Sequence, residues 1–317
     1  MIGFWGGLVF YNSYLPEVAY PEQQDKSSAI GFSFGYVGSV LLLSFNLFMI
    51  MNPKLFGIPG NENESSIIAM RYSFILVGVW WIIFSQYSFY YLPRVNNKKK
   101  VSIQIFWNGY KELRGVWRSL KNEIGLKRFL SAFFLYSTAL QTVILVAAYF
   151  GEEEILWPDT AQKTIGLIVS ILLIQLVGII GAILTARASK KFGNIPILIF
   201  VNILWAIICL MAYYIKSPLE FYITACFVGL VMGGLQALSR STYSRLIPKT
   251  KNTTSFFSFY DVSEKIGIVI GMIIFGILDQ YTGNMRTSIL FFFILFLFGA
   301  IMLNRVPREK LSKKNMA

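Results

Sequence analysis

Long apolar runs, separated by short polar connections, recur along the whole sequence. A helix that crosses a bilayer needs about 20 mostly apolar residues, in a range of roughly 17–25. The predicted spans are Ile2–Leu15, Ala29–Met51, Tyr72–Leu92, Phe129–Phe150, Thr164–Ala186, Ile195–Ile215, Phe221–Leu238, Ile266–Leu278 and Thr287–Leu303. The first and the eighth of these are short. Because the runs lack the period-two alternation of barrel strands, they predict an all-α, polytopic bundle of about nine transmembrane helices.

The composition favours the same class of protein. Apolar residues make up 55% of the 317 residues, charged residues 14%, and the mean hydropathy is +0.57. A soluble domain carries about 25% charged residues, because its surface must be hydrated. We therefore expect an integral membrane protein, surrounded by the lipid bilayer, rather than two soluble domains.

The net charge of +13 could indicate a nucleic-acid partner, so the positions of the charges matter. Of the 29 Lys and Arg residues, 22 fall in alternate connections or in the C-terminal tail. These segments are Arg94–Arg128, Arg187–Lys191, Arg240–Lys251 and Arg305–Lys314. The positive-inside rule predicts that they and the C-terminus face the cytoplasm, with no nucleic acid bound. The abundance of Lys, Asn, Ile and Phe favours a bacterial inner membrane.

The longest basic connection divides the chain unequally. We predict a three-span portion over residues 1–93, a basic amphipathic linker over 94–128, a six-span half-bundle over 129–304 and a cytoplasmic tail over 305–317. Three spans against six do not fit a transporter built from two repeated halves. We therefore expect three further spans upstream, lost through truncation or a wrongly chosen start codon. A stable nine-span protein is the alternative.

An apolar stripe runs along the linker at steps of three and four residues. It consists of Ile103, Phe106, Tyr110, Leu113, Trp117, Leu120 and Ile124, and around it lie Lys111, Arg114, Arg118 and Lys121. This spacing predicts an amphipathic helix that lies in the cytoplasmic membrane surface and braces the bundle. Nucleic-acid binding is the alternative, and the position between two spans argues against it.

Several tracts have a distinctive residue pattern. They are Phe10–Pro16, Gly31–Leu43, Trp80–Ser85, Gly233–Pro248 and Phe256–Lys265. In this order they resemble the end of helix four, helices five, six and ten, and the start of helix eleven of one major facilitator subfamily. That subfamily comprises the autophagy-related vacuolar amino-acid effluxers and their bacterial relatives. The resemblance covers essentially the whole chain, and it implies the major facilitator fold with spans equivalent to helices 4–12.

Two tracts depart from the patterns of this superfamily. In the cytoplasmic motif between helices eight and nine, Ala186 replaces the usual Gly and Lys190 occupies the position of the usual Asp. The gating ion pair expected at that Asp therefore cannot form there. In helix seven, Tyr136–Thr142 lacks the acidic residue that many relatives carry, so a proton carrier at that position is unsupported.

The composition also excludes several kinds of chemistry. The chain has no His, and its two Cys residues, Cys209 and Cys226, both lie inside apolar runs. Ser-His-Asp triads, Cys-His dyads and His metal sites are therefore ruled out. With no phosphate-binding loop or metal cluster in the sequence, we expect neither an enzyme nor a protein that needs a metal or cofactor.

A charge at the bilayer centre costs about 2.5–3.5 kcal/mol on insertion scales, and charged residues are absent from the middle of the predicted spans. The exceptions cluster near the cytoplasmic ends of the spans that resemble helices ten and eleven, and they are candidates for a gate. Asp261, Glu264 and Lys265 share one face of a helix, and Arg240 precedes them in the facing helix. We predict that they form a cytoplasmic ion-pair network, to which Arg187 of the loop motif is added. A static ion pair at the membrane interface is the alternative.

Polar residues near the middle of the spans are candidates for a substrate cavity. They are Asn12, Ser137, Thr138, Gln141 and Gln236. Gln141 lies in the helix-seven tract Tyr136–Thr142, and Gln236 lies in the helix-ten tract Gly233–Pro248. Hydrogen bonding between helices is the commoner use of such residues.

These patterns favour a secondary-active transporter that moves a small solute by alternating access, with amino acids as the substrate class that the resemblance suggests. The alternative is a membrane protein that does not transport, such as an assembly factor or a gene remnant, because part of the cavity wall would be missing.

Overall fold

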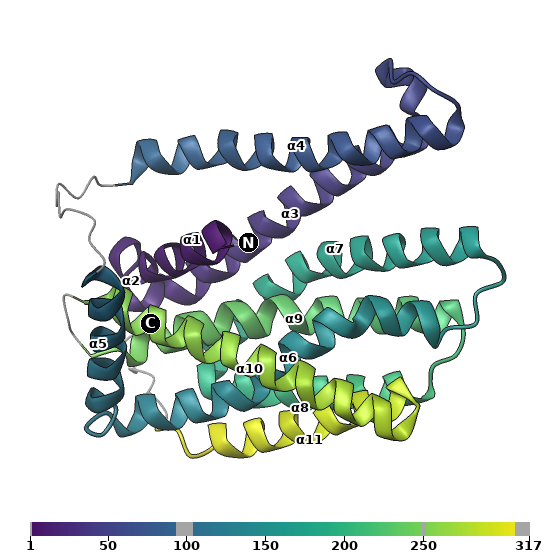
Figure 1. The fold of residues 1–317 in the computed structure, drawn as a ribbon. Helices are drawn as coiled ribbons and strands as arrows, with labels where there is room; N and C mark the ends of the chain where they lie inside the picture. Colours follow the sequence, from purple (N-terminus) through teal and green to yellow (C-terminus); the bar gives the residue numbers. More distant parts are fainter. Residues whose placement is uncertain (1, 93–103, 249–251, 308–317) are drawn as a thin grey trace. The chain divides into compact units, whose positions relative to one another are not determined.

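The computed structural model describes residues 2–92, 104–248 and 252–307 of the chain. Every regular element in these ranges is a helix (Figure 1). The elements are α1 (Ile2–Ser13), α2 (Leu15–Val18), the 3-10 turn η1 (Pro21–Gln23), α3 (Gln24–Met51), the 3-10 turn η2 (Pro53–Phe56), α4 (Glu62–Tyr91), α5 (Gln104–Ser119), α6 (Ile124–Glu153), α7 (Thr160–Phe192), α8 (Asn194–Tyr214), α9 (Pro218–Leu246), α10 (Thr253–Thr282) and α11 (Met285–Leu303). The basic residues at 94–100 and from 308 onward lie outside the described residues.

All nine predicted spans lie in helices, which confirms the all-α, polytopic architecture. Seven helices in the described ranges are long and apolar enough to cross a membrane. The first predicted span corresponds to α1, which has 12 residues and is shorter than a bilayer-crossing helix needs to be. The eighth predicted span lies in α10, which begins 13 residues before the apolar run and has 30 residues in all.

The described residues fall into two compact units. The first comprises Met1–Tyr36 and Phe106–Ala317, and therefore holds α1, α2, the start of α3, α5 from Phe106 onward and the helices α6 to α11. The second, Val37–Ile105, holds the rest of α3, η2 and α4, with a small buried cluster of Met49, Ile58 and Ala69. All candidate site residues lie in the first unit. The division of the chain into a three-span portion, a linker, a half-bundle and a tail, with boundaries at 93, 128 and 304, stays a prediction.

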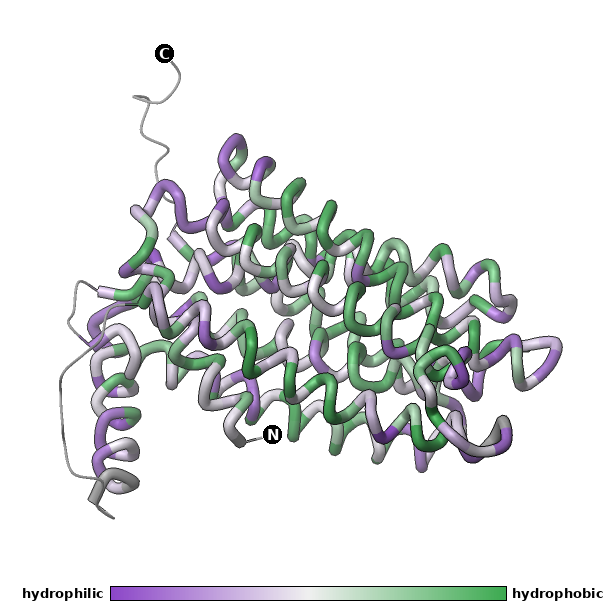
Figure 2. The backbone as a smooth tube through the Cα atoms, turned by 90° about the horizontal axis from the view of Figure 1, so that it is seen from above, coloured by the Kyte–Doolittle hydropathy of each residue, from purple (hydrophilic) through white to green (hydrophobic). Residues whose placement is uncertain are grey.

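In the first unit, α6, α8 and α10 begin at the end where α7, α9 and α11 finish. We call this the basic end, because it carries Lys190 and Lys191 at the end of α7 and Arg245 at the end of α9. Hydrophobic residues are concentrated along the middle of the helices, and hydrophilic residues gather toward their ends (Figure 2). This distribution is that of helices whose middles contact lipid and whose ends contact water.

Local sequence explains where several helices begin. Asn61 accepts a hydrogen bond from the backbone of Glu64, whose carboxylate accepts from the Asn61 backbone, so the two form a capping box for α4. Ser217 and Glu220 form the same arrangement at the start of α9. Gly193, with φ +88°, is the single residue between α7 and α8, a conformation that disfavours residues with a β-carbon.

Small residues bring α7 and α9 together. Gly181 packs against the backbone of Leu230, and Gly229 against the backbone of Ile174. Gly233, four residues after Gly229, approaches the carbonyl oxygen of Gly178. Close approach of backbones through small residues is the usual way in which membrane helices associate, since lipid provides no hydrophobic driving force between them.

Aromatic side chains form the buried centre between α6, α9 and α10. The rings of Phe133 and Tyr260 stack with centroids 4.0 Å apart, and Tyr243 lies 4.7 Å from Tyr260. The Tyr136 hydroxyl and the Ser239 hydroxyl are 2.8 Å apart and share a hydrogen bond. These contacts place the polar groups of the candidate site next to a rigid aromatic core.

At the end opposite the basic end, Arg286 joins three helices. Its Nε donates to Glu154 Oε2 at 2.8 Å, and its other nitrogens donate to the carbonyl oxygens of Glu154, Tyr213 and Ile215. Helix carbonyls at C-termini have no partner within the helix, so the guanidinium satisfies groups that would otherwise need water. The helices α6, α8 and α11 are thereby tied together.

Replacing Gly181 by Ala should destabilise the protein, because the new β-carbon would overlap the backbone of Leu230. We expect a loss of about 1–3 kcal/mol, typical of overpacked cores, measured as a lower midpoint of thermal unfolding in detergent. Gly276→Ala is the matched control, because nothing lies within 4 Å of that β-carbon. Equal midpoints for the two variants would contradict the packing described here.

Candidate functional site

The most densely hydrogen-bonded charged group at the basic end is the carboxylate of Asp25, in the first turn of α3. Arg245 on α9 pairs with Asp25 Oδ2 at 2.5 Å. Asn194 Nδ2, at the start of α8, donates to Asp25 Oδ1 at 2.8 Å. The Ser189 hydroxyl on α7 lies 3.3 Å from Oδ2. One buried carboxylate thus binds side chains from three other helices.

This cluster was missed by the sequence analysis. Asp25 precedes the apolar run that begins at Ala29 and therefore has the pattern of a connection, whereas α3 begins one residue before it. The loop motif between α7 and α8 has Lys190 where the usual pattern has an acidic residue. The structure shows an acid from a different helix, Asp25, bound beside that motif by Ser189 and Asn194.

Arg240 on α9 is a buried guanidinium surrounded by neutral groups, with only 4% of the residue exposed. Its Nε donates to the Ser28 hydroxyl at 3.0 Å, and one terminal nitrogen donates to Asn12 Oδ1 at 3.3 Å. The guanidinium also lies over the rings of Tyr11 and Phe32, at 4.6 and 5.3 Å from their centroids. Among the described residues, no carboxylate is within ion-pair distance of it. Within the described part of the chain, its charge is therefore stabilised by dipoles and aromatic faces.

A second charged group lies between α6, α10 and α1. Glu264 accepts a short hydrogen bond from the Gln141 side chain and pairs with Lys265 at 3.0 Å. The Lys265 ammonium lies 3.7 Å from the centroid of the Trp5 ring. The side chains of Glu264 and Lys265 are 14% and 29% exposed, so both charges are partly accessible.

The predicted four-residue network is therefore divided in the structure. Arg240 interacts with α1 and α3, and Glu264 with Lys265 and Gln141. Asp261 is 5% exposed, and its Oδ1 has no hydrogen-bond partner among the described residues. Arg187 is exposed at the end of α7 and forms no ion pair with the described part of the chain.

The candidate cavity residues also separate into groups. Asn12 and Gln141 contact the charged groups described above, and Gln236 accepts from the Tyr36 hydroxyl at 3.4 Å. Ser137 and Thr138 instead donate to a carbonyl oxygen of their own helix, that of Phe134. The packing of Thr138 against Gly267 of α10 favours a structural use of that side chain.

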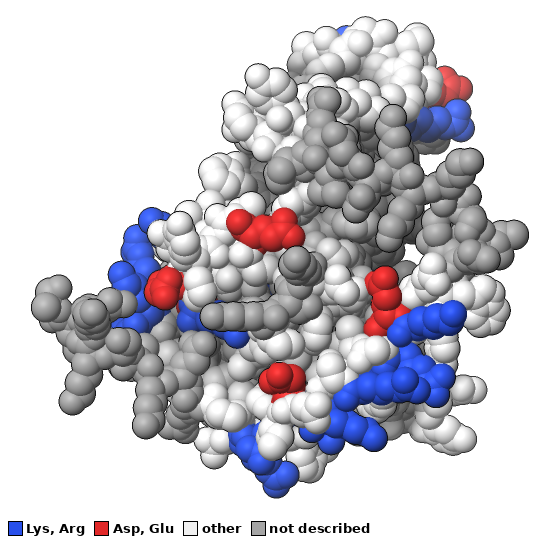
Figure 3. Space-filling view, turned by 90° about the vertical axis from the view of Figure 1, so that its left-hand side faces the viewer, with Lys and Arg blue, Asp and Glu red and all other residues white. Residues whose placement is uncertain are grey.

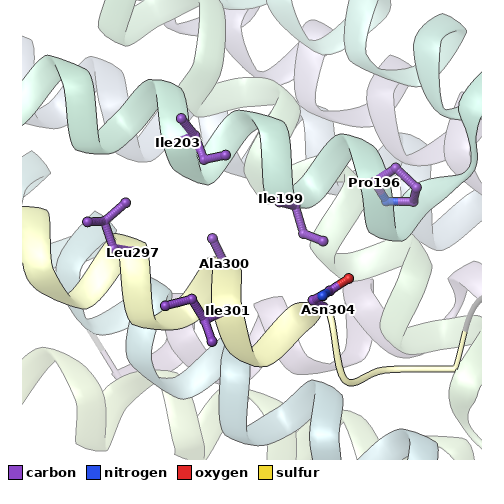
Figure 4. Close-up of a pocket in the computed structure, with 7 residues that line it drawn as sticks. All are labelled: Pro196, Ile199, Ile203, Leu297, Ala300, Ile301 and Asn304. Carbon is purple, nitrogen blue, oxygen red and sulfur yellow. The ribbon is translucent and has the colours of Figure 1, made fainter.

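A groove of about 470 Å³ lies away from these residues, between α8 and α11 (Figure 4). It is lined by Pro196, Ile199, Ile203, Leu297, Ala300, Ile301 and Asn304. Its lining offers a polar or charged solute one side-chain amide, that of Asn304, and otherwise aliphatic side chains. The groove is therefore suited to a lipid chain and is not the candidate site.

Comparison with known proteins gives a consistent assignment. A family profile described as "Vacuole effluxer Atg22 like" matches residues 1–316. The MFS-type transporter YxiO of Bacillus subtilis is 28% identical over 315 residues, covering 97% of this chain and 69% of the relative. Autophagy-related protein 22 of Eremothecium gossypii is 27% identical over 314 residues, covering 92% of this chain and 58% of that protein. The chain therefore spans little more than half the length of the fungal relative.

Among solved structures, the fucose:proton symporter FucP of Escherichia coli has the same fold. It superposes with a TM-score of 0.66 and covers 95% of this chain and 73% of its own, at 13% sequence identity. The major facilitator fold predicted from the sequence is thereby confirmed.

Changing both Asp25 and Arg245 should destabilise the protein by less than the sum of the two single changes, because either single change breaks the pair and leaves the other charge uncompensated. In a double-mutant cycle of Asp25→Asn and Arg245→Gln, followed by unfolding in mixed micelles, we expect a coupling of about 0.5–3 kcal/mol. The exposed pair Lys163–Glu152 is the control, and its coupling should be about 0–1 kcal/mol. Additive effects of the Asp25 and Arg245 changes would contradict the cluster.

Proposed function

Because the chain belongs to the Vacuole effluxer Atg22-like family of major facilitator transporters, we propose that it moves a small solute across the membrane by alternating access. The observation that carries the proposal is the Asp25 cluster. It joins α3 to α7, α8 and α9 at one end of the first unit through a charged, breakable set of contacts.

The Asp25 cluster has the properties of a gate. A transporter that opens alternately at its two ends needs contacts at each end that exist in one state and not in the other. Packed aliphatic side chains would give a permanent contact, whereas an ion pair can exchange its partners for water. Arg240 on α9 contributes further contacts between helices at the same end, because it donates hydrogen bonds to Asn12 of α1 and Ser28 of α3.

The basic end is proposed to face the cytoplasm. Lys190, Lys191 and Arg245 at the helix ends carry the charge that the positive-inside rule assigns to that side. This orientation places the Asp25 gate, and the C-terminus that follows α11, in the cytoplasm. A bacterial inner membrane fits the sequence composition and the Bacillus subtilis relative.

The substrate class that fits the charged groups is the amino acids, in agreement with the resemblance of the sequence to amino-acid effluxers. An amino acid at neutral pH carries an ammonium and a carboxylate on neighbouring atoms. Glu264 and Lys265 offer one charge of each sign, both partly accessible, with the Gln141 amide beside them. A zwitterion can bind in place of the Glu264–Lys265 contact, with its ammonium on Glu264 and its carboxylate on Lys265.

The test is exchange in proteoliposomes that contain the full chain. Radiolabelled phenylalanine should be taken up, and unlabelled phenylalanine should compete with it. Phenethylamine, which lacks the carboxylate, and hydrocinnamate, which lacks the ammonium, should compete at least about tenfold less well, since each loses a charge-assisted contact.

Glu264→Gln should raise the apparent KM for phenylalanine about tenfold or more, because the ammonium loses its counter-charge. Glu153→Gln is the matched control, since Glu153 is exposed at the opposite end and makes no contact with the site. Equal competition by the three solutes would contradict the zwitterion site. No uptake of any amino acid, with the protein correctly folded, would contradict amino-acid transport itself.

A further inference from the structure

Helix α5 lies across the basic end of the first unit. It runs across the direction of the long helices in Figure 1 and again in the view from above (Figure 2). Val116 and Leu120 are each 5% exposed and anchor the C-terminal part of the helix. The Glu112 carboxylate accepts a hydrogen bond from Ser255, in the first turn of α10, at 2.7 Å. A helix in this position runs parallel to the membrane plane if the bundle crosses the membrane.

The apolar residues of α5 form two groups. Val116 and Leu120 belong to the core cluster of the bundle, and Leu113 is partly buried. Trp107, Tyr110 and Trp117 are instead 65%, 60% and 64% exposed. At about 100° per residue, these three aromatic residues lie within roughly 80° of one another on the helix. Trp117 also contacts the bundle, because its ring centroid lies 6.0 Å from that of Phe259 on α10. The predicted apolar stripe is therefore only partly used for packing, and Trp107 and Tyr110 are its outward-facing aromatic residues.

Basic residues border the exposed aromatic side chains. Lys111, Arg114 and Arg118 are exposed, and at about 100° per residue they lie within roughly 60° of one another, next to Trp107. Lys and Arg predominate over Asp and Glu on the lower part of this end of the molecule (Figure 3). The one acidic residue of α5, Glu112, is on another side of the helix and is bound to Ser255.

We propose that this face of α5 binds the anionic phospholipid headgroups of the membrane leaflet at the basic end. Amphipathic aromatic rings favour the depth of the headgroups, where one part of the ring contacts acyl chains and the other contacts water. Lys and Arg at that depth attract anionic lipids rather than neutral ones. The position of α5 at the end of a membrane-crossing bundle puts these side chains at that depth.

Site-directed spin labelling tests the proposal without depending on transport. Cys209 and Cys226 are replaced by Ala, and a single label is attached to the full chain after Tyr110→Cys. The protein is reconstituted in vesicles of phosphatidylcholine alone or of phosphatidylcholine with phosphatidylglycerol. Collision with a water-soluble nickel chelate should fall several-fold, and collision with oxygen should rise, when phosphatidylglycerol is present.

Two controls separate lipid binding from other causes. A label at Gly109→Cys, which is exposed and has nothing within 4 Å, lies about 140° or more from the three basic residues on the helix and should stay accessible to nickel in both vesicles. Arg187→Gln with Lys190→Gln and Lys191→Gln removes three charges from the end of α7, and it should leave the response at Tyr110→Cys unchanged.

Lys111→Gln with Arg114→Gln and Arg118→Gln should abolish the response to phosphatidylglycerol, whereas exchanging Lys for Arg and Arg for Lys at the same positions should retain it. A label at Tyr110→Cys that is equally accessible to nickel in both vesicles would overturn the proposal. So would a full response in the Gln variant, because the basic residues would then not bind the lipid.

Discussion

Four helices meet at the buried carboxylate of Asp25, and the arrangement of the basic end depends on it. A carboxylate removed from water is stable only when its oxygens are bound by donors or opposite charges. Arg245, Asn194 and Ser189 provide these from α9, α8 and α7. Removing one partner would leave an uncompensated charge, so the helix ends are held in register by a strong electrostatic requirement rather than by packing alone.

The other charged groups of the first unit show how different surroundings change what a charge can do. Arg286 at the opposite end is bound to a carboxylate and to helix carbonyls, which suits a permanent tie between α6, α8 and α11. Arg240 is more deeply buried and is surrounded by neutral dipoles and rings. Glu264 and Lys265 bind each other and remain partly exposed. Arg240, Glu264 and Lys265 therefore keep charges that are either without a counter-charge among the described residues or partly accessible, and a solute could interact with them.

The sequence predicted the membrane architecture well because lipid imposes a simple rule. Backbone groups in the bilayer must be bonded internally, so a span is either a helix or a strand of a closed barrel, and long apolar runs without period-two alternation indicate helices. Polar residues inside those runs are conspicuous, and this is why Asn12 and Gln141 could be selected, whereas Arg240 and Glu264 were selected as charges next to the ends of two runs. Asp25 and Arg286 lie at helix ends, where charged residues are ordinary, and hydropathy does not distinguish them. Whether Arg240 binds α10 or instead α1 and α3 depends on packing that spacing within one helix does not encode.

The turn at Gly193 has a mechanical consequence. A single residue separates α7 from α8, so the two helices form a hairpin with almost no slack between them. Ser189 and Asn194 lie on either side of that turn and hold the same carboxylate, one from each arm. Any displacement that draws one arm away must carry the other with it. The contacts of Ser189 and Asn194 with Asp25 are therefore expected to break together when the hairpin moves. Such coupled breaking favours an abrupt opening of the basic end over a gradual one.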